Sequence, residues 1–234
     1  MLLLPVLLGV AASRPSPWQL AVAAAALTGY LFSATLQTWS RGRRPPEYRA
    51  PIAVYGVAFA SLGLLLAISF PALLAVLLVV VPTGLIVFRG AQPGTRRDLA
   101  NSLAQVVQAL VLVPAAACVS GEFDLARVVP YTLVAAGYLF GTVLVVRSVL
   151  RERGNGGFAA LSVGFHMVLV VLAALALPAA YAVLALLLAS RAAALPVVQR
   201  RLASGPKPLR PVHVGIVEIV SSVAVVMVAF AVPI

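Results

Sequence analysis

Long apolar runs separated by short polar breaks dominate the pattern of this chain. Most runs contain about 20 residues, roughly the length that an α-helix needs to cross a bilayer. Strands of a membrane barrel would instead alternate over about ten residues. The pattern predicts an all-α, polytopic transmembrane bundle with nine segments, roughly 1–12, 17–39, 51–69, 71–88, 99–119, 128–149, 157–177, 179–198 and 212–233. Pro71 and Pro178 mark two tight breaks, because proline cannot continue the preceding helix.

The first segment, residues 1–12, is shorter than a membrane span. At the rise of an α-helix it reaches only about 18 Å, against a hydrocarbon core of about 30 Å. One interpretation is a signal peptide, although no basic residue precedes the apolar stretch. The other is a helix that lacks about its first ten residues, which the internal repeat described next favours.

The chain contains an internal repeat. The stretch GYLF at 29–32 returns at 137–140, and Arg43 then aligns with Arg151. PALLAVLL resembles PAAYAVLA, and LLLPVLLGV resembles LVLVPAAACV, at nearly the same offset. Segments one to four therefore resemble segments five to eight. We predict one transmembrane domain with two parallel four-helix repeats and a last helix, at 1–90, 96–200 and 211–234.

Composition and charge agree with a membrane protein. The chain is 62% hydrophobic and only 10% charged, whereas soluble domains carry about 25% charged residues. Fifteen of the 17 basic residues lie in or beside the loops that follow even-numbered segments. The positive-inside rule places these loops and the N-terminus in the cytoplasm and the C-terminus outside. The net charge of +11 is therefore explained by topology and lipid headgroups, with no nucleic-acid partner.

Polar side chains form a stripe on the fifth segment. Asp98, Asn101, Gln105 and Gln108 are spaced so that they share one helical face. Such a stripe is unfavourable against lipid, so it is expected to face the protein interior or a wet cavity. Hydrogen bonding between helices and a binding pocket both remain open as its role.

One carboxylate lies within a predicted span. Glu218 is in the last segment, and Arg191 on the eighth lies near the same depth, so we predict that they pair. The pair is either part of a functional site or a structural ion pair, and a Glu kept neutral by burial is a further alternative. His213 is expected at the membrane interface and His166 as a packed side chain.

Arginines end the two GYLF helices. Arg147 and Arg151 are one turn apart at the end of the sixth segment, and Arg43 follows Gln37 after the second. Guanidinium groups bind phosphate and carboxylate in a bidentate manner. If the repeats pack about a pseudo-twofold axis, both clusters flank one cytoplasmic mouth. For a single loop arginine, topology and headgroup contact are the preferred explanation. Arg147, nearest the span, is the exception and the preferred binding candidate.

Motifs for metal or cofactor chemistry are absent from the sequence. It has no H-E-x-x-H, G-x-S-x-G, Walker A or C-x-x-C motif. No loop carries the paired carboxylates that would hold Mg²⁺ against a diphosphate. We therefore predict no metal site and no cofactor.

At MLLLPVLLGV, RRDLANSLAQVVQALVLVP and HVGIVEIVSS the chain resembles the YwiC-like family of bacterial integral membrane proteins. The resemblance extends over the whole chain and implies a location in the bacterial inner membrane. In that family a HGAW stretch usually precedes MLLLP, in line with a shortened first segment. The resemblance implies no particular activity.

The architecture also resembles the UbiA-type prenyltransferase superfamily, which has nine helices in two four-helix repeats and a lateral cavity facing lipid. That superfamily carries aspartate-rich Mg²⁺-diphosphate motifs after helices two and six. Here those places read TWSRGRRPPEYR and VVRSVLRERGN, so arginine stands where aspartate is expected. The resemblance therefore implies a fold and not the usual Mg²⁺-assisted reaction.

These observations favour a membrane protein with a cytoplasm-facing cavity that binds an isoprenoid or an anionic membrane lipid, and a divergent prenyltransferase is one form of it. The alternatives are a small transporter lined by Glu218 and the polar stripe, and a non-catalytic scaffold. Whether the protein is an enzyme, and its oligomeric state, stay open. The candidate binding residues are Gln37, Arg43, Asp98, Asn101, Gln105, Arg147, Arg151, Arg191 and Glu218.

Overall fold

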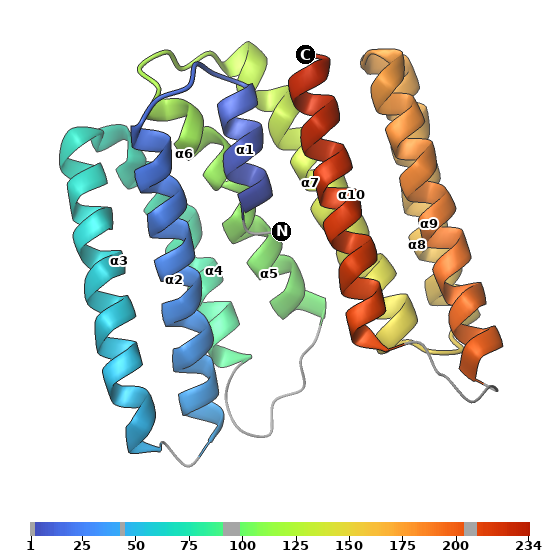
Figure 1. Cartoon of the computed structure of the whole chain (residues 1–234), viewed down its shortest axis with the longest axis horizontal. Helices are drawn as coiled ribbons and strands as arrows, with labels where there is room; N and C mark the ends of the chain where they lie inside the picture. The colour runs from blue at the N-terminus through green and yellow to red at the C-terminus, as the bar shows by residue number, and fades with distance from the viewer. Residues whose placement is uncertain (1–2, 43–44, 91–98, 204–209) are drawn as a thin grey trace. The chain divides into compact units, whose positions relative to one another are not determined.

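The computed structural model describes residues 3–42, 45–90, 99–203 and 210–234. Within these ranges every regular element is a helix (Figure 1). The α-helices are α1 (Leu3–Ala11), α2 (Trp18–Arg41), α3 (Arg49–Ser69), α4 (Leu77–Arg89), α5 (Leu99–Leu110), α6 (Leu112–Cys118), α7 (Leu125–Leu150), α8 (Gly156–Ala176), α9 (Ala179–Ala203) and α10 (Pro211–Ala231). The short 3₁₀ helices are η1 (Pro46–Tyr48) and η2 (Pro71–Val76).

These helices reproduce the nine predicted segments. The largest difference is at the end of α9, which reaches Ala203 instead of residue 198. In the described part of the chain, eight helical segments are long and apolar enough to cross a membrane, and α1 is too short. In this count η1 is joined to α3, η2 to α4 and α5 to α6. The prediction of a polytopic helical bundle is confirmed.

The fifth predicted segment is a broken helix. It forms α5 and α6, with a turn at Val111 between them. Pro114 lies four residues after Leu110 and has no N–H to donate to the Leu110 carbonyl, so the helical ladder is interrupted there. Prolines also mark the predicted breaks, since Pro71 opens η2 and Pro178 separates α8 from α9.

The chain divides into two compact units, and the boundary falls inside α7. The N-terminal unit comprises residues 2–135, and the C-terminal unit comprises residues 136–234. In the N-terminal unit α2 packs along α3, α1 against α6, and α4 against α5. In the C-terminal unit α8 packs along α9, and α10 also contacts α9.

The second helix of each predicted repeat uses its GYLF glycine as a contact point. A methyl group on Gly29 of α2 would lie 2.9 Å from the ring of Phe59 on α3. A methyl group on Gly137 of α7 would lie 3.1 Å from Leu169 on α8. Each glycine therefore lets a large apolar side chain of the following helix approach closely. The repeat itself stays a prediction.

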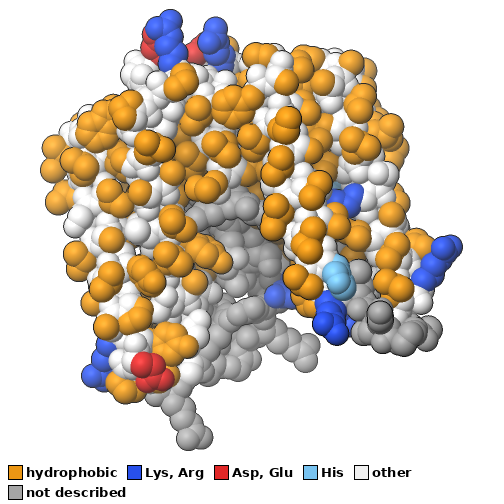
Figure 2. All heavy atoms as spheres, in the orientation of Figure 1, with side chains coloured by type: hydrophobic (Ala, Val, Ile, Leu, Met, Phe, Trp, Pro, Cys, Tyr) orange, Lys and Arg blue, Asp and Glu red, His pale blue; other side chains and the backbone are white. Residues whose placement is uncertain are grey.

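Apolar side chains cover much of the outer surface of both units. Leu20, Leu78 and Leu175 are each at least 75% exposed. On the face drawn in Figure 2, hydrophobic side chains cover the middle of the helices, and most charged side chains gather near the helix ends. A surface of this kind is stable against lipid and would associate in water.

Candidate functional site

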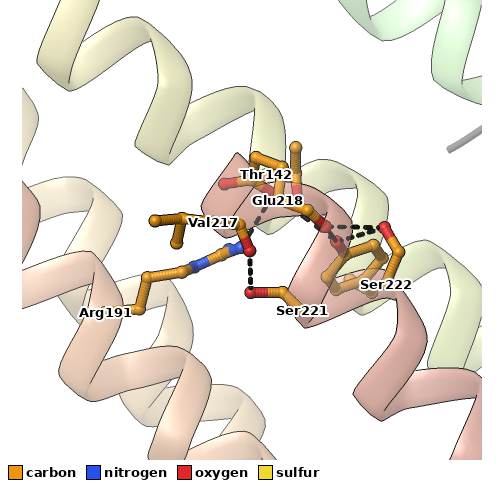
Figure 3. Close-up of polar contacts among 7 residues, drawn as sticks. Thr142, Arg191, Val217, Glu218, Ser221 and Ser222 are labelled. Carbon is orange, nitrogen blue, oxygen red and sulfur yellow. Dashed lines mark hydrogen bonds and ion pairs between the residues drawn. The ribbon is translucent and has the colours of Figure 1, made fainter. Parts of the chain in front are cut away.

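A buried ion pair joins α9 to α10 in the C-terminal unit. Arg191 Nη1 lies 2.8 Å from Glu218 Oε2, and the two side chains are 7% and 6% exposed. Arg191 is in the middle of α9, and Glu218 lies in the third turn of α10. Figure 3 shows Arg191 reaching across to the carboxylate. The predicted pairing of these two residues is confirmed.

Helix α7 supplies two further groups to this pair. The Thr142 hydroxyl donates to Glu218 Oε2 at 2.9 Å. The Tyr138 hydroxyl lies 3.0 Å from the Glu218 carbonyl oxygen and 2.8 Å from Ser222 Oγ. Tyr138 and Thr142 are four residues apart, so they project from one face of α7. Glu218 and Ser222 have the same spacing on α10, and the two faces meet.

The Tyr138 ring also faces the guanidinium group. Arg191 Cζ lies 5.9 Å from the ring centroid. This separation is within the range of a cation–π contact. The positive charge is thus held by one carboxylate and one aromatic face. Together these five side chains, Tyr138, Thr142, Arg191, Glu218 and Ser222, form what we call the charged cluster.

The charged cluster has hydrogen-bonding groups that it does not use. Glu218 Oε1 and Arg191 Nε and Nη2 are buried and have no hydrogen-bond partner among the described residues. Nε and Nη2 belong to the same edge of the planar guanidinium group, the edge that binds an oxyanion in a bidentate manner. A buried polar group left without a partner costs about 1–3 kcal/mol. The cluster therefore has the capacity to bind a further polar group.

A second polar pair lies on α8. His166 Nδ1 is 2.7 Å from the Ser162 carbonyl oxygen, and both residues are buried. Ser162 Oγ has no hydrogen-bond partner in the described part of the chain. His166 is packed as predicted.

An open groove of about 580 Å³ lies between α8 and α9. Small side chains line it, among them Ala159, Ala160 and Gly164 of α8 and Ala193 of α9. Arg200 also lines it. An adjoining hollow shares Arg200 and adds polar residues near the ends of the helices, which are Ser148, Glu152, Asn155 and Gln199. The groove thus joins an apolar wall to a polar end.

Arg147 lies beside this polar end. Its side chain is 14% exposed, and Nη2 is 3.6 Å from Oε1 of Glu152. That separation is too long for a hydrogen bond. Arg147 Nε and Nη1 are buried without a hydrogen-bond partner among the described residues. Arg151, one turn later, is exposed.

The remaining candidate residues that the structure describes lie on helices of the N-terminal unit. Gln37 donates to Ser33 Oγ at 3.0 Å on its own helix. In the polar stripe Asn101 is buried, as expected for an interior face, whereas Gln105 is exposed. For Gln105 the alternative of a wet cavity stays a prediction. Gln108 donates to the Val80 carbonyl of α4 at 3.4 Å, a hydrogen bond between helices. Arg43 and Asp98 lie outside the described residues.

Sequence reasoning missed several members of the site. Tyr138 served only as a repeat marker, and Thr142, Ser222 and Arg200 were not singled out. The signal for the first three was i, i+4 spacing in an apolar helix, between the hydroxyl residues Tyr138 and Thr142 and between Glu218 and Ser222. No local signal distinguishes Arg200 from other loop-proximal arginines.

Eight apolar helical segments within the described residues, together with a buried charged cluster, indicate a multi-pass integral membrane protein. A family model described as YwiC-like protein matches residues 1–117, and the chain belongs to this family. The match ends before α7, so the charged cluster and the groove lie beyond it. Comparisons with curated proteins and with solved structures found no match.

Proposed function

We propose that the protein binds an anionic amphiphile, a membrane lipid or an isoprenoid phosphate, in the C-terminal unit. The observation that carries the proposal is the groove between α8 and α9, whose apolar wall leads to Arg200. The ligand chain lies along the wall, and its anionic head lies at the end where Arg147 and Arg200 are found.

The wall suits a hydrocarbon chain because its side chains are small. Ala159, Ala160 and Ala193 leave room between two long helices, and Gly164 opens onto empty space. Each methylene group moved from water to such a surface contributes about 0.8 kcal/mol. A ligand already in the membrane gains less, so the head must supply selectivity.

The polar end suits a phosphate. Arg147 has two buried nitrogen atoms, Nε and Nη1, without hydrogen-bond partners in the described chain. They lie on different edges of the guanidinium group, so each can donate one charge-assisted hydrogen bond to a phosphate oxygen. By the positive-inside rule this end is cytoplasmic, with the N-terminus inside and the C-terminus outside a bacterial inner membrane. An isoprenoid diphosphate fits the same description, and divergent prenyl transfer is the reaction that the UbiA-type resemblance would add.

Native mass spectrometry of the purified protein tests this proposal. We expect bound phosphatidylglycerol or geranylgeranyl diphosphate, and no bound phosphatidylcholine, because the last has no net negative charge. The first two probes separate a membrane lipid from an isoprenoid ligand. Arg147→Ala and Arg200→Ala should each reduce the bound fraction.

Gly164→Leu gives a test of the groove itself, because it places a side chain in the open space and should block the ligand chain. Gly63→Leu is the matched control, since Gly63 is also a helical glycine facing open space and lies in the N-terminal unit. Equal ligand occupancy in wild type, Gly164→Leu and Arg200→Ala would contradict the proposal.

Transport is the second candidate function. The charged cluster favours it, because ionisable residues inside membrane helices often mark ion or substrate pathways.

A further inference from the structure

The Arg191–Glu218 pair is neutral as a whole, yet both partners keep unused binding capacity. Glu218 Oε2 accepts from Arg191 and Thr142, whereas Glu218 Oε1 accepts nothing among the described residues. Arg191 uses Nη1 alone, and its Nε–Nη2 edge has no hydrogen-bond partner in the described chain and is buried. The unused edge of Arg191 is therefore suited to bind an oxyanion, and the unused oxygen of Glu218 is suited to bind a proton.

The unused edge of Arg191 is suited to an oxyanion. Nε–H and Nη2–H point in parallel and match two oxygens of a carboxylate or a phosphate. The low dielectric inside the helices strengthens these hydrogen bonds. A water molecule could accept hydrogen bonds from the same two nitrogen atoms. It carries no negative charge, however, so the guanidinium group attracts it less strongly than an oxyanion.

The net charge of the buried pair determines whether a proton must bind together with the anion. An anion added to the neutral pair would leave one uncompensated negative charge among buried groups, which is strongly unfavourable. A proton on Glu218 Oε1 restores neutrality, and Arg191 then compensates the anion instead of the carboxylate. Arg191 keeps its own proton throughout.

The other titratable groups on the surrounding helices already have hydrogen-bond partners. Tyr138 faces the pair from α7, and its hydroxyl donates within the cluster. His166 on α8 is buried, and its Nδ1 donates to the Ser162 carbonyl oxygen. On α10 itself His213 lies at the exposed start of the helix, where its Nδ1 accepts from the Arg210 N–H. Glu218 is the buried acceptor with an unused oxygen.

We propose that the Arg191–Glu218 pair is a binding site for one small oxyanion, a carboxylate or a phosphate, together with one proton. Arg191 Nε and Nη2 donate hydrogen bonds to two oxygens of the anion. One O–H bond forms at Glu218 Oε1, and the proton comes from solvent. The net charge of the pair and its ligands stays at zero when a monoanion binds.

This site is separate from the groove proposed above and does not rest on it. It shares no residue with the groove, and its ligand needs no hydrocarbon chain. A failure of the lipid-binding experiment therefore leaves this proposal standing, and the reverse is also true.

Titration calorimetry of the full chain in detergent tests the proposal, with sodium acetate and sodium phosphate as separate probes. Repeating the titration in buffers of different ionisation enthalpy measures the protons taken up for each anion. We expect about one proton for each monoanion at a pH where Glu218 is charged. Over that pH range the affinity for acetate should rise about tenfold for each unit that the pH falls, because one proton is taken up on binding.

Two variants separate the anion from the proton. Glu218→Gln imitates the protonated carboxyl, so it should still bind the anion, without proton uptake and with an affinity that no longer depends on pH. The double variant Arg191→Gln/Glu218→Gln keeps a neutral pair able to hydrogen bond and should lose anion binding. Thermal unfolding of each variant in detergent checks that it is folded.

Arg127→Gln is the control, because Arg127 is exposed and lies in the N-terminal unit. It should bind like the wild type. The proposal is overturned if the wild type binds neither probe, if binding takes up no proton, or if Glu218→Gln keeps the full pH dependence. Unchanged binding in the double variant would overturn it as well. The probe that binds more tightly identifies the ligand as carboxylate or phosphate.

Discussion

Two ion pairs of almost equal length lie in the two units, and their surroundings differ. Arg14 and Glu122 of the N-terminal unit are 2.9 Å apart with side chains 76% and 57% exposed. Arg191 and Glu218 of the C-terminal unit are 2.8 Å apart and 7% and 6% exposed. The first pair is solvated on most sides, while the second must find every partner within the protein. The distance between the two charged groups therefore does not determine how much an ion pair contributes to stability, because burial differs between the two pairs.

The buried polar groups of the N-terminal unit are used differently. Gln19 donates from one amide nitrogen to Ser13 Oγ, the Arg14 carbonyl and the Ala116 carbonyl. This neutral side chain ties the connection before α2 to α6. In the C-terminal unit the buried residues Arg191 and Glu218 carry charge and retain atoms without hydrogen-bond partners among the described residues. The contrast supports a structural role for Gln19 and agrees with the binding role proposed for the charged cluster.

The largest expected effect is at the buried pair. Arg191→Gln leaves Glu218 buried without its counter-charge, which should lower the free energy of unfolding by about 3–5 kcal/mol. Adding Glu218→Gln should recover much of this loss, because the uncompensated charge is then removed. Denaturant unfolding of the purified variants measures both. A single variant as stable as the double variant would mean that the pair is not buried as described.

A smaller effect is expected where the N-terminal unit relies on close backbone contact. A methyl group on Gly9 of α1 would lie 2.5 Å from the Val113 carbonyl oxygen of α6, which cannot move away easily. Gly9→Ala should destabilise the protein by about 1–3 kcal/mol. Gly63→Ala is the control, since open space surrounds that position and alanine favours the helix. Equal melting temperatures for the two variants would contradict the packing of α1 on α6.

The smallest effect is expected at the exposed pair. Arg14→Ala should change the free energy of unfolding by less than about 1 kcal/mol, and less still at high salt, because water screens the interaction. The same unfolding measurement at two salt concentrations checks this. A loss as large as that of Arg191→Gln would remove the distinction between the two pairs.

Much of the fold was predictable because helix length and hydropathy are local properties. Neighbouring residues were enough to predict the nine segments, the helix breaks at Pro71 and Pro178, and the burial of His166. The sequence pattern did not predict the break of the helix at Val111, although Pro114 lies three residues later. The apolar stretch has the length of one span, and hydropathy alone does not show a kink in its middle. The sequence did not distinguish buried Asn101 from exposed Gln105, because their shared helical face does not specify which neighbouring helices cover each residue.

For the candidate site, too, some features could be predicted from the sequence and others could not. By itself the sequence determined that Glu218 lies inside a span and that Arg191 lies at a similar depth, because rise per residue sets depth. Only the tertiary structure decided that Thr142 and Tyr138 meet this pair, which atoms stay unused, and that small side chains of α8 and α9 leave a groove beside Arg200. The physical reason is that these properties depend on how helices distant in sequence pack and rotate against one another, which hydrophobic periodicity within one helix does not specify.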